Sequence, residues 1–82
     1  MERVDPKYPA IAQDARIRGE VVLRAVISKT GEIENLEAVS GHPMLVPAAI
    51  DAVRQWRYRP FLLNGVAVEV ETVITITFQI SG

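Results

Sequence analysis

The stretch NGVAVEVETVITITFQI (64–80) decides the fold, because it joins a turn signal to the most regular alternation in the chain. Asn64-Gly65 is a favoured pair for a tight type I′ hairpin turn. From Val68 to Ile80 the even positions are apolar apart from one threonine, and the odd positions are mostly polar. A period of two predicts a long strand with one face on a core and the other toward solvent.

This strand is too long to run straight through a small domain. Residues 66–80 would extend about 50 Å at ~3.3 Å per residue. A domain of 82 residues is only about 25–30 Å across. We therefore expect the strand to bend, or its first part to pair with 58–63 while its second part joins the main sheet.

A short helix is expected near the N-terminus. Pro9 suits its first turn, because proline lacks an N–H that would have no partner there. Gly19 suits its stop. Tyr8 and Ile17 can share its narrow apolar side.

An antiparallel hairpin is expected next. Residues 20–29 alternate cleanly, with Leu23 on the core face, and the Thr30-Gly31 pair supplies a turn. Residues 32–40 return as a second strand, but their alternation slips. One extra residue near Asn35 would restore the register, which is what a β-bulge does.

A second helix follows a proline-bracketed start. Pro43 and Pro47 flank its first turn, and the apolar positions from Leu45 to Trp56 recur at helical spacing. Trp56 and its neighbour Tyr58 could form an aromatic pair that contacts a peptide. We favour the interpretation that Trp56 anchors the helix on the sheet and Tyr58 packs beside it.

Together these elements predict one α+β domain over 1–82, with its core at about 6–80. The order is α-β-β-α-β: a three-stranded antiparallel sheet with two helices on one face. The expected strand order is 2-1-3, which leaves the last strand at an edge. The structural core is expected to include Tyr8, Ile17, Leu23, Leu45, Trp56, Tyr58 and Phe78.

Composition narrows the function without naming it. The formal charge of −1 argues against a nucleic-acid partner, which would need broad phosphate neutralisation. The single histidine, His42, lies between Gly41 and Pro43 without ligand-spaced acids, and there is no cysteine. No catalytic motif is present. We expect no enzyme activity, no catalytic residue, no metal and no cofactor.

A basic cluster lies at the end of the second helix. It consists of Arg54, Arg57 and Arg59. These side chains could meet an acidic partner, but we interpret them as a solvated helix end that complements the helix dipole.

The order of the motifs resembles the C-terminal domain of the TonB family of energy transducers. The residues that carry the resemblance are Tyr8-Pro9, Gly19, Gly31, SGHP (40–43), AAIDAV (48–53), RQWRYRP (54–60), Asn64-Gly65 and the terminal FQI (78–80). The resemblance covers nearly the whole chain, and the Trp-Arg-Tyr-x-Pro run is its most specific part.

The resemblance implies a periplasmic domain that binds the TonB box of an outer-membrane transporter by β-strand addition along its last strand. In the full-length protein an N-terminal helix and a Pro-rich linker would join it to the inner membrane and its motor proteins, which supply motion driven by the proton-motive force. Neither part is present in these 82 residues, so an excised domain or a stand-alone relative is expected.

The resemblance also implies which residues meet the peptide. They are Asp5, Lys7, Thr72, Val73, Ile74, Thr75, Ile76, Thr77 and Gln79. The pattern alone fits an ordinary solvent-facing strand about as well. Because an open edge can also pair with its own copy, the alternative is a self-pairing homodimer used as a scaffold in a sensor or envelope protein.

Overall fold

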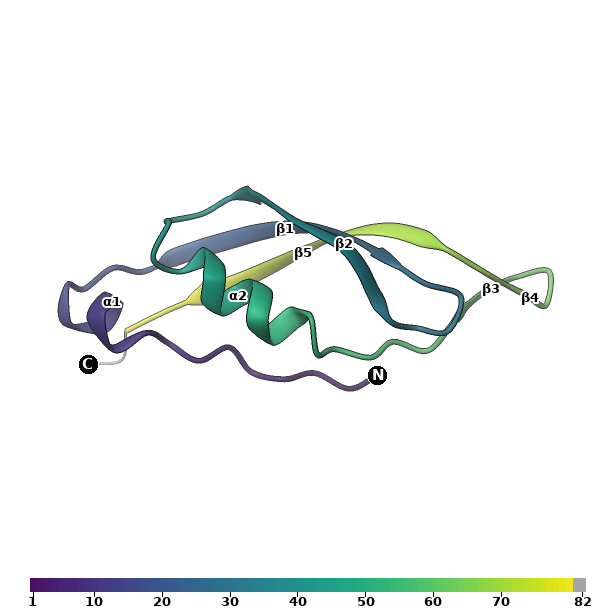
Figure 1. Ribbon diagram of the computed structural model, residues 1–82, viewed down its shortest axis with the longest axis horizontal. Helices are drawn as coiled ribbons and strands as arrows, with labels where there is room; N and C mark the ends of the chain where they lie inside the picture. The colour runs from purple at the N-terminus through teal and green to yellow at the C-terminus, as the bar shows by residue number, and fades with distance from the viewer. Residues whose placement is uncertain (81–82) are drawn as a thin grey trace.

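Figure 1 shows the computed structural model, which describes residues 1–80. The elements in chain order are α1 (Ala10–Asp14), β1 (Gly19–Ile27), β2 (Ile33–Ser40), α2 (Val46–Val53), β3 (Phe61–Leu63), β4 (Val66–Val68) and β5 (Val70–Phe78). β1, β2 and β5 form a three-stranded antiparallel sheet in the order β2-β1-β5. The predicted fold class and strand order are confirmed. No helix within 1–80 is both long enough and apolar enough to cross a membrane.

The core lies between one face of the sheet and the two helices. The alternating side chains of β1 point into it, so that Val21, Leu23 and Ala25 are fully buried. Ala12 of α1 and Val53 of α2 join the same buried cluster. The period of two in the strands therefore produces one covered face and one open face.

The pairing of β1 with β2 contains the expected bulge. Val26 lies opposite Glu34 and Arg24 lies opposite Glu37, so β2 has one residue more than β1 between these pairs. Asn35 has a positive φ of 48°, a conformation that asparagine tolerates better than most residues. The slip in the sequence pattern is thus a β-bulge that returns the apolar side chains of β2 to their face.

The first helix ends earlier than the sequence predicts. The N–H of Ile17 donates to the carbonyl of Ala12 (2.8 Å), and the N–H of Arg16 donates to that of Gln13 (3.0 Å). Arg16 has a φ of 56°. These bonds form a Schellman stop in which arginine occupies the left-handed position that glycine usually takes. The expectation that Gly19 stops the helix is wrong, because Gly19 begins β1.

The second helix also ends before its apolar pattern does. Its last residue is Val53, and the tightened bond from the Trp56 N–H to the Val53 carbonyl (2.9 Å) follows it. Trp56 is still only 3% exposed. The arginine cluster begins at the C-cap, Arg54, and continues beyond the helix, and all three of its side chains are exposed, as expected of a solvated helix end.

The molecule is longer than its residue count suggests. Its extents are 48 × 21 × 16 Å, against the roughly 25–30 Å expected from length. The expected division of the long strand is confirmed, because β4 pairs with β3 while β5 pairs with β1, and Glu69 separates them. Figure 1 shows the reason for the length: the β3–β4 hairpin extends beyond the end of the three-stranded sheet.

Candidate functional site

The most distinctive feature of the sheet is the outer edge of β5. All nine residues of β5 pair with β1, from Val70 opposite Ile27 to Phe78 opposite Gly19. Within residues 1–80, no other strand pairs with β5, and no turn or loop backbone bonds to it. An antiparallel strand directs alternate N–H and C=O groups to its two sides. One set of these groups is therefore open to an incoming chain.

The core holds this edge in an extended conformation. Ile74, Ile76 and Phe78 are 6%, 8% and 3% exposed, and they anchor β5 on the helix-covered face. The continuous register with β1 fixes the other side of the strand. Since the strand is already ordered, an added chain would cost the domain little conformational entropy.

The residues of β5 in the predicted peptide site, together with Gln79 just after the strand, fall into two groups. The side chains of Thr75, Thr77 and Gln79 are exposed, Val73 is 62% exposed, and Thr72 is half-buried. The side chains of Ile74 and Ile76 lie in the core. These two isoleucines therefore offer no side chain to a peptide.

The N-terminal segment is fixed at several points. Glu2 and Arg57 exchange two backbone hydrogen bonds of 2.7 and 2.9 Å. The Trp56 Nε1 donates to the carbonyl of Val4 (2.9 Å), and the Arg3 guanidinium lies 4.7 Å from the centre of the Trp56 ring. Nothing in the sequence pattern of residues 1–5 signals these contacts.

The two predicted site residues in this segment, Asp5 and Lys7, are exposed. Within 1–80 neither forms a hydrogen bond or ion pair with β5. The segment does reach β5 at Tyr8, whose ring packs edge-on against Phe78 at 5.3 Å between centroids. Asp5 and Lys7 therefore lie just ahead of a residue that contacts the end of β5.

The expected core residues occupy the interior or its margin. Leu23, Leu45, Trp56 and Phe78 are buried in one cluster. The other three expected residues, Tyr8, Ile17 and Tyr58, are partly buried and pack against that cluster. The Tyr8 hydroxyl donates to the Ile17 carbonyl, and Tyr58 lies 6.4 Å from Trp56 between ring centroids.

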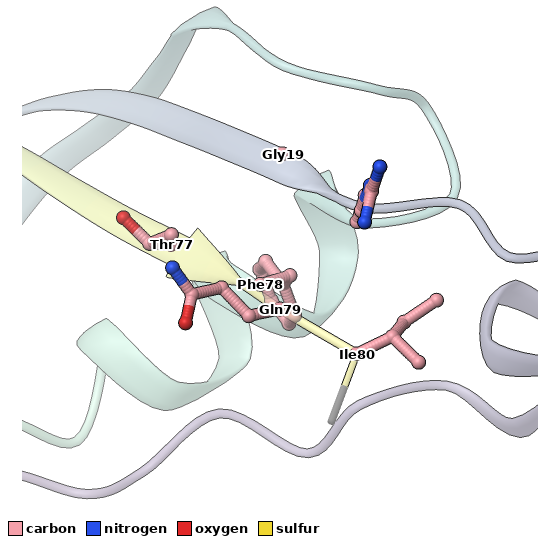
Figure 2. Close-up of a pocket in the computed structure, with 6 residues that line it drawn as sticks. Gly19, Thr77, Phe78, Gln79 and Ile80 are labelled. Carbon is pink, nitrogen blue, oxygen red and sulfur yellow. The ribbon is translucent and has the colours of Figure 1, made fainter. Parts of the chain in front are cut away.

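Shallow hollows lie around the end of β5, and two of them are lined by residues that the structure describes. One, of about 400 Å³, is lined by Arg18, Gly19 and residues 77–80 (Figure 2). The other, of about 290 Å³, is lined by Tyr8, Gln13, Gln79 and Ile80. In Figure 2 the side chains of Thr77 and Gln79 project to one side and Ile80 to the other.

The ionisable side chains that line these hollows are Arg18 in one and Tyr8 in the other. Among the residues that the structure describes, no charged or polar side chain is buried. The same part of the chain has no group of three histidine, aspartate or glutamate side chains that could hold a metal ion. Both hollows lie at the C-terminal end of β5.

The open face of the sheet is crossed by a small charge network. Arg24 of β1 lies 2.8 Å from Glu37 of β2 and 3.3 Å from Glu71 of β5. All three side chains are about half exposed or more, so their pairing adds little to stability. Glu71 also places a charge on the edge strand, which disfavours uncontrolled edge-to-edge association.

Comparison with known proteins links this arrangement to one family. Residues 4–80 match the family model described as Gram-negative bacterial TonB protein C-terminal. The chain is 33% identical over 82 residues to Protein TonB of Vibrio cholerae, with 98% of this chain and 34% of that protein covered. It is also 33% identical to Protein TonB of Escherichia coli, over 100% of this chain and 33% of that protein. The chain thus spans about a third of the length of these relatives.

A solved structure has the same architecture. The solution NMR structure of the Pseudomonas aeruginosa TonB CTD superposes with a TM-score of 0.84 at 25% identity. The match covers 100% of this chain and 85% of that chain. The sheet with two helices on one face is therefore shared with a TonB C-terminal domain across the whole length of this chain.

Proposed function

The chain belongs to the family of Gram-negative bacterial TonB protein C-terminal domains, and from this premise we propose that it binds the TonB box of an outer-membrane transporter by strand addition along β5. The observation that carries the proposal is the edge of Val70–Phe78, which within residues 1–80 has backbone pairing on its β1 side only. An extended peptide would satisfy the open groups of this edge.

The expected strength follows from the hydrogen bonds. Five or six backbone bonds at about 0.5–1.5 kcal/mol each give a gross gain of several kcal/mol. Ordering a flexible peptide removes part of this gain. We expect a dissociation constant of about micromolar or weaker, which suits a contact that must form and release repeatedly.

Side chains would supply the selectivity. The exposed Val73, Thr75, Thr77 and Gln79 lie along the open face of β5 and would meet every second side chain of the added peptide. Asp5 and Lys7, ahead of Tyr8, would meet the peptide from the N-terminal segment. The backbone groups of Thr72, Ile74 and Ile76 alternate with those of Val73, Thr75 and Thr77, so these three residues would hold the strand in register with β1 while the peptide binds.

In the whole protein, the domain would transmit motion rather than catalyse a reaction. We place it in the periplasm, joined through further N-terminal sequence to the inner membrane and its motor proteins. Motion driven by the proton-motive force would then reach the transporter through the added strand.

The test uses peptides that carry a TonB box and a chemical block on the backbone. N-methylation removes one peptide N–H without touching the domain. Strand addition predicts that methylation at alternate positions abolishes binding in calorimetry, whereas methylation at the positions between them has little effect. Equal effects at all positions would contradict strand addition.

A proline in the strand gives the matching test on the domain. Thr75→Pro should abolish peptide binding, because proline distorts the ladder and lacks an N–H. Circular dichroism must first show that the variant is folded. Unchanged affinity in a folded Thr75→Pro variant would count against the mechanism.

The same open edge supports one second candidate, an edge-to-edge homodimer through β5. Sedimentation distinguishes the two. A monomer over a wide concentration range supports the peptide site, and a dimer that the peptide does not dissociate supports self-pairing.

A further inference from the structure

The β3–β4 hairpin exposes apolar side chains on both of its faces. Phe61, Leu62, Leu63 and Val66 are 53%, 59%, 59% and 63% exposed. The register pairs Leu63 with Val66 and Leu62 with Ala67. Since paired residues share a face and successive residues alternate, Phe61 and Leu63 lie on one face and Leu62 on the other.

The hairpin takes no part in the core. Residues 61–68 are absent from the buried cluster and from the partly buried side chains that pack against it. The hairpin lies at one end of the 48 Å axis, beyond the three-stranded sheet (Figure 1). The turn itself needs only Asn64 and Gly65, both of which have positive φ. The fold therefore does not explain the apolar side chains.

The exposure of apolar side chains on both faces indicates which kind of surface the hairpin binds. A protein partner that docks on one face would leave the opposite face in water. Four side chains that are each a little over half exposed offer about 400 Å² of apolar surface, whereas a stable dimer buries about 600–1,000 Å² per partner. A ribbon that is apolar on both faces suits a medium that surrounds it, and the boundary region of a lipid bilayer is such a medium.

The charges beside the hairpin add a second argument. Residues 54–68 contain three arginines and no acidic residue, and Glu69 follows directly after β4. Arg57 is joined to Glu2 and Glu32 by backbone bridges. Arg59 is exposed, forms no ion pair within residues 1–80, and directly precedes Pro60 at the base of the hairpin. An arginine next to an apolar tip fits lipid phosphate groups.

We propose that the β3–β4 hairpin is a membrane-surface anchor that inserts Phe61, Leu62, Leu63 and Val66 into the headgroup–acyl boundary of a bilayer. The insertion is shallow, because a two-stranded ribbon has unpaired backbone groups on both edges that cannot enter hydrocarbon. Its strands of three residues span about 10 Å, which matches the 5–10 Å depth of interfacial elements. This anchor does not depend on peptide binding at β5.

The test is co-sedimentation of the whole 82-residue chain with vesicles of phosphatidylethanolamine and phosphatidylglycerol. The double variant Leu62→Ser/Leu63→Ser should lower the vesicle partition coefficient by about tenfold or more. Val39→Ser and Ile11→Ser are the matched controls, since Val39 is 51% and Ile11 is 64% exposed at sites away from the hairpin and from the β5 edge. The controls should stay within about twofold of the parent chain.

A fluorescence measurement reports insertion directly. Phe61→Trp should shift its emission to the blue when vesicles are added, after subtraction of the signal of Trp56 in the parent chain. Persistence of the shift on phosphatidylcholine vesicles supports apolar insertion. Arg59→Gln should weaken binding to phosphatidylglycerol vesicles by a few fold and leave binding to phosphatidylcholine unchanged.

Three results would overturn the proposal: a parent chain that does not bind vesicles, a double variant that binds as well as the controls, or a dimer in sedimentation that the double variant abolishes. The last would assign the hairpin to a second copy. Peptide affinity at β5 should be equal in the parent chain and the double variant, so the failure of one proposal leaves the other testable.

Discussion

Gly31 lies backbone to backbone against Tyr58. The Tyr58 N–H donates to the Gly31 carbonyl at 2.9 Å, and a Cβ atom at Gly31 would overlap the Tyr58 carbonyl oxygen. Gly31 also has a φ of +88°, a conformation that side-chain-bearing residues rarely adopt. This contact fixes the chain after α2 against the β1–β2 turn, and so sets where the hairpin and β5 begin.

Gly31→Ala should therefore be strongly destabilising. Backbone strain and the overlap with Tyr58 together should lower the free energy of unfolding by at least about 3 kcal/mol. Urea denaturation followed by circular dichroism measures the loss.

Gly65→Ala is the matched control for this substitution. Gly65 has a φ of +79° but no atom within 4 Å of a built Cβ. The strain alone should cost about 1–2 kcal/mol. Equal losses of unfolding free energy in the two variants would mean that the contact between Gly31 and Tyr58 does not contribute to stability.

Trp56 should stabilise the N-terminal segment as well as the core. Trp56→Phe removes the Nε1 hydrogen bond to Val4 and shrinks a side chain that is 3% exposed. We expect a loss of about 1–3 kcal/mol in the free energy of unfolding.

A double-mutant cycle separates the two effects. Removal of residues 1–4 should cost less in the Trp56→Phe background than in the parent chain, because the Val4 carbonyl and the indole bond to each other. Identical costs in both backgrounds would show that the segment and the tryptophan are not coupled.

Arg16 occupies a position that suits glycine better. Its φ of 56° at the end of α1 costs an arginine about 1–2 kcal/mol, while glycine adds back about 0.5–1 kcal/mol of chain entropy. Arg16→Gly should therefore raise the free energy of unfolding by about 0.5 kcal/mol. The control Arg18→Gly, with no positive φ to relieve, should lower stability, and a loss in both variants would refute the assignment of strain to Arg16.

Most of the fold could be predicted because strand periodicity dominates this chain. Three local signals are found in the structure at the predicted positions. They are the alternation in 68–80, the slip near Asn35 and the Asn64-Gly65 turn. Both helix ends were misplaced for a physical reason. Arg16 stops α1 in a conformation that propensity assigns to glycine, and Trp56 keeps helical spacing after the helix has ended.

The open edge of the last strand could be predicted from the sequence, but the contacts of the N-terminal segment could not. An edge strand follows from strand order, which short connections and apolar faces determine. The bonds of Glu2 with Arg57 and of Val4 with Trp56 join residues more than fifty positions apart. No periodic pattern records contacts of this kind. The sequence pattern also does not show that Leu62 and Leu63 are exposed, because leucine is usually a core residue.

Amide hydrogen exchange of β5, read residue by residue by NMR, tests the central claim most directly. In the free domain, alternate amides of Val70–Phe78 should exchange slowly because they bond to β1, and the amides between them should exchange fast. Addition of a TonB-box peptide should slow the fast set and leave the slow set unchanged. Slow exchange of both sets without peptide in the monomer, or a peptide that binds and leaves the fast set fast, would contradict an open edge that accepts an added strand.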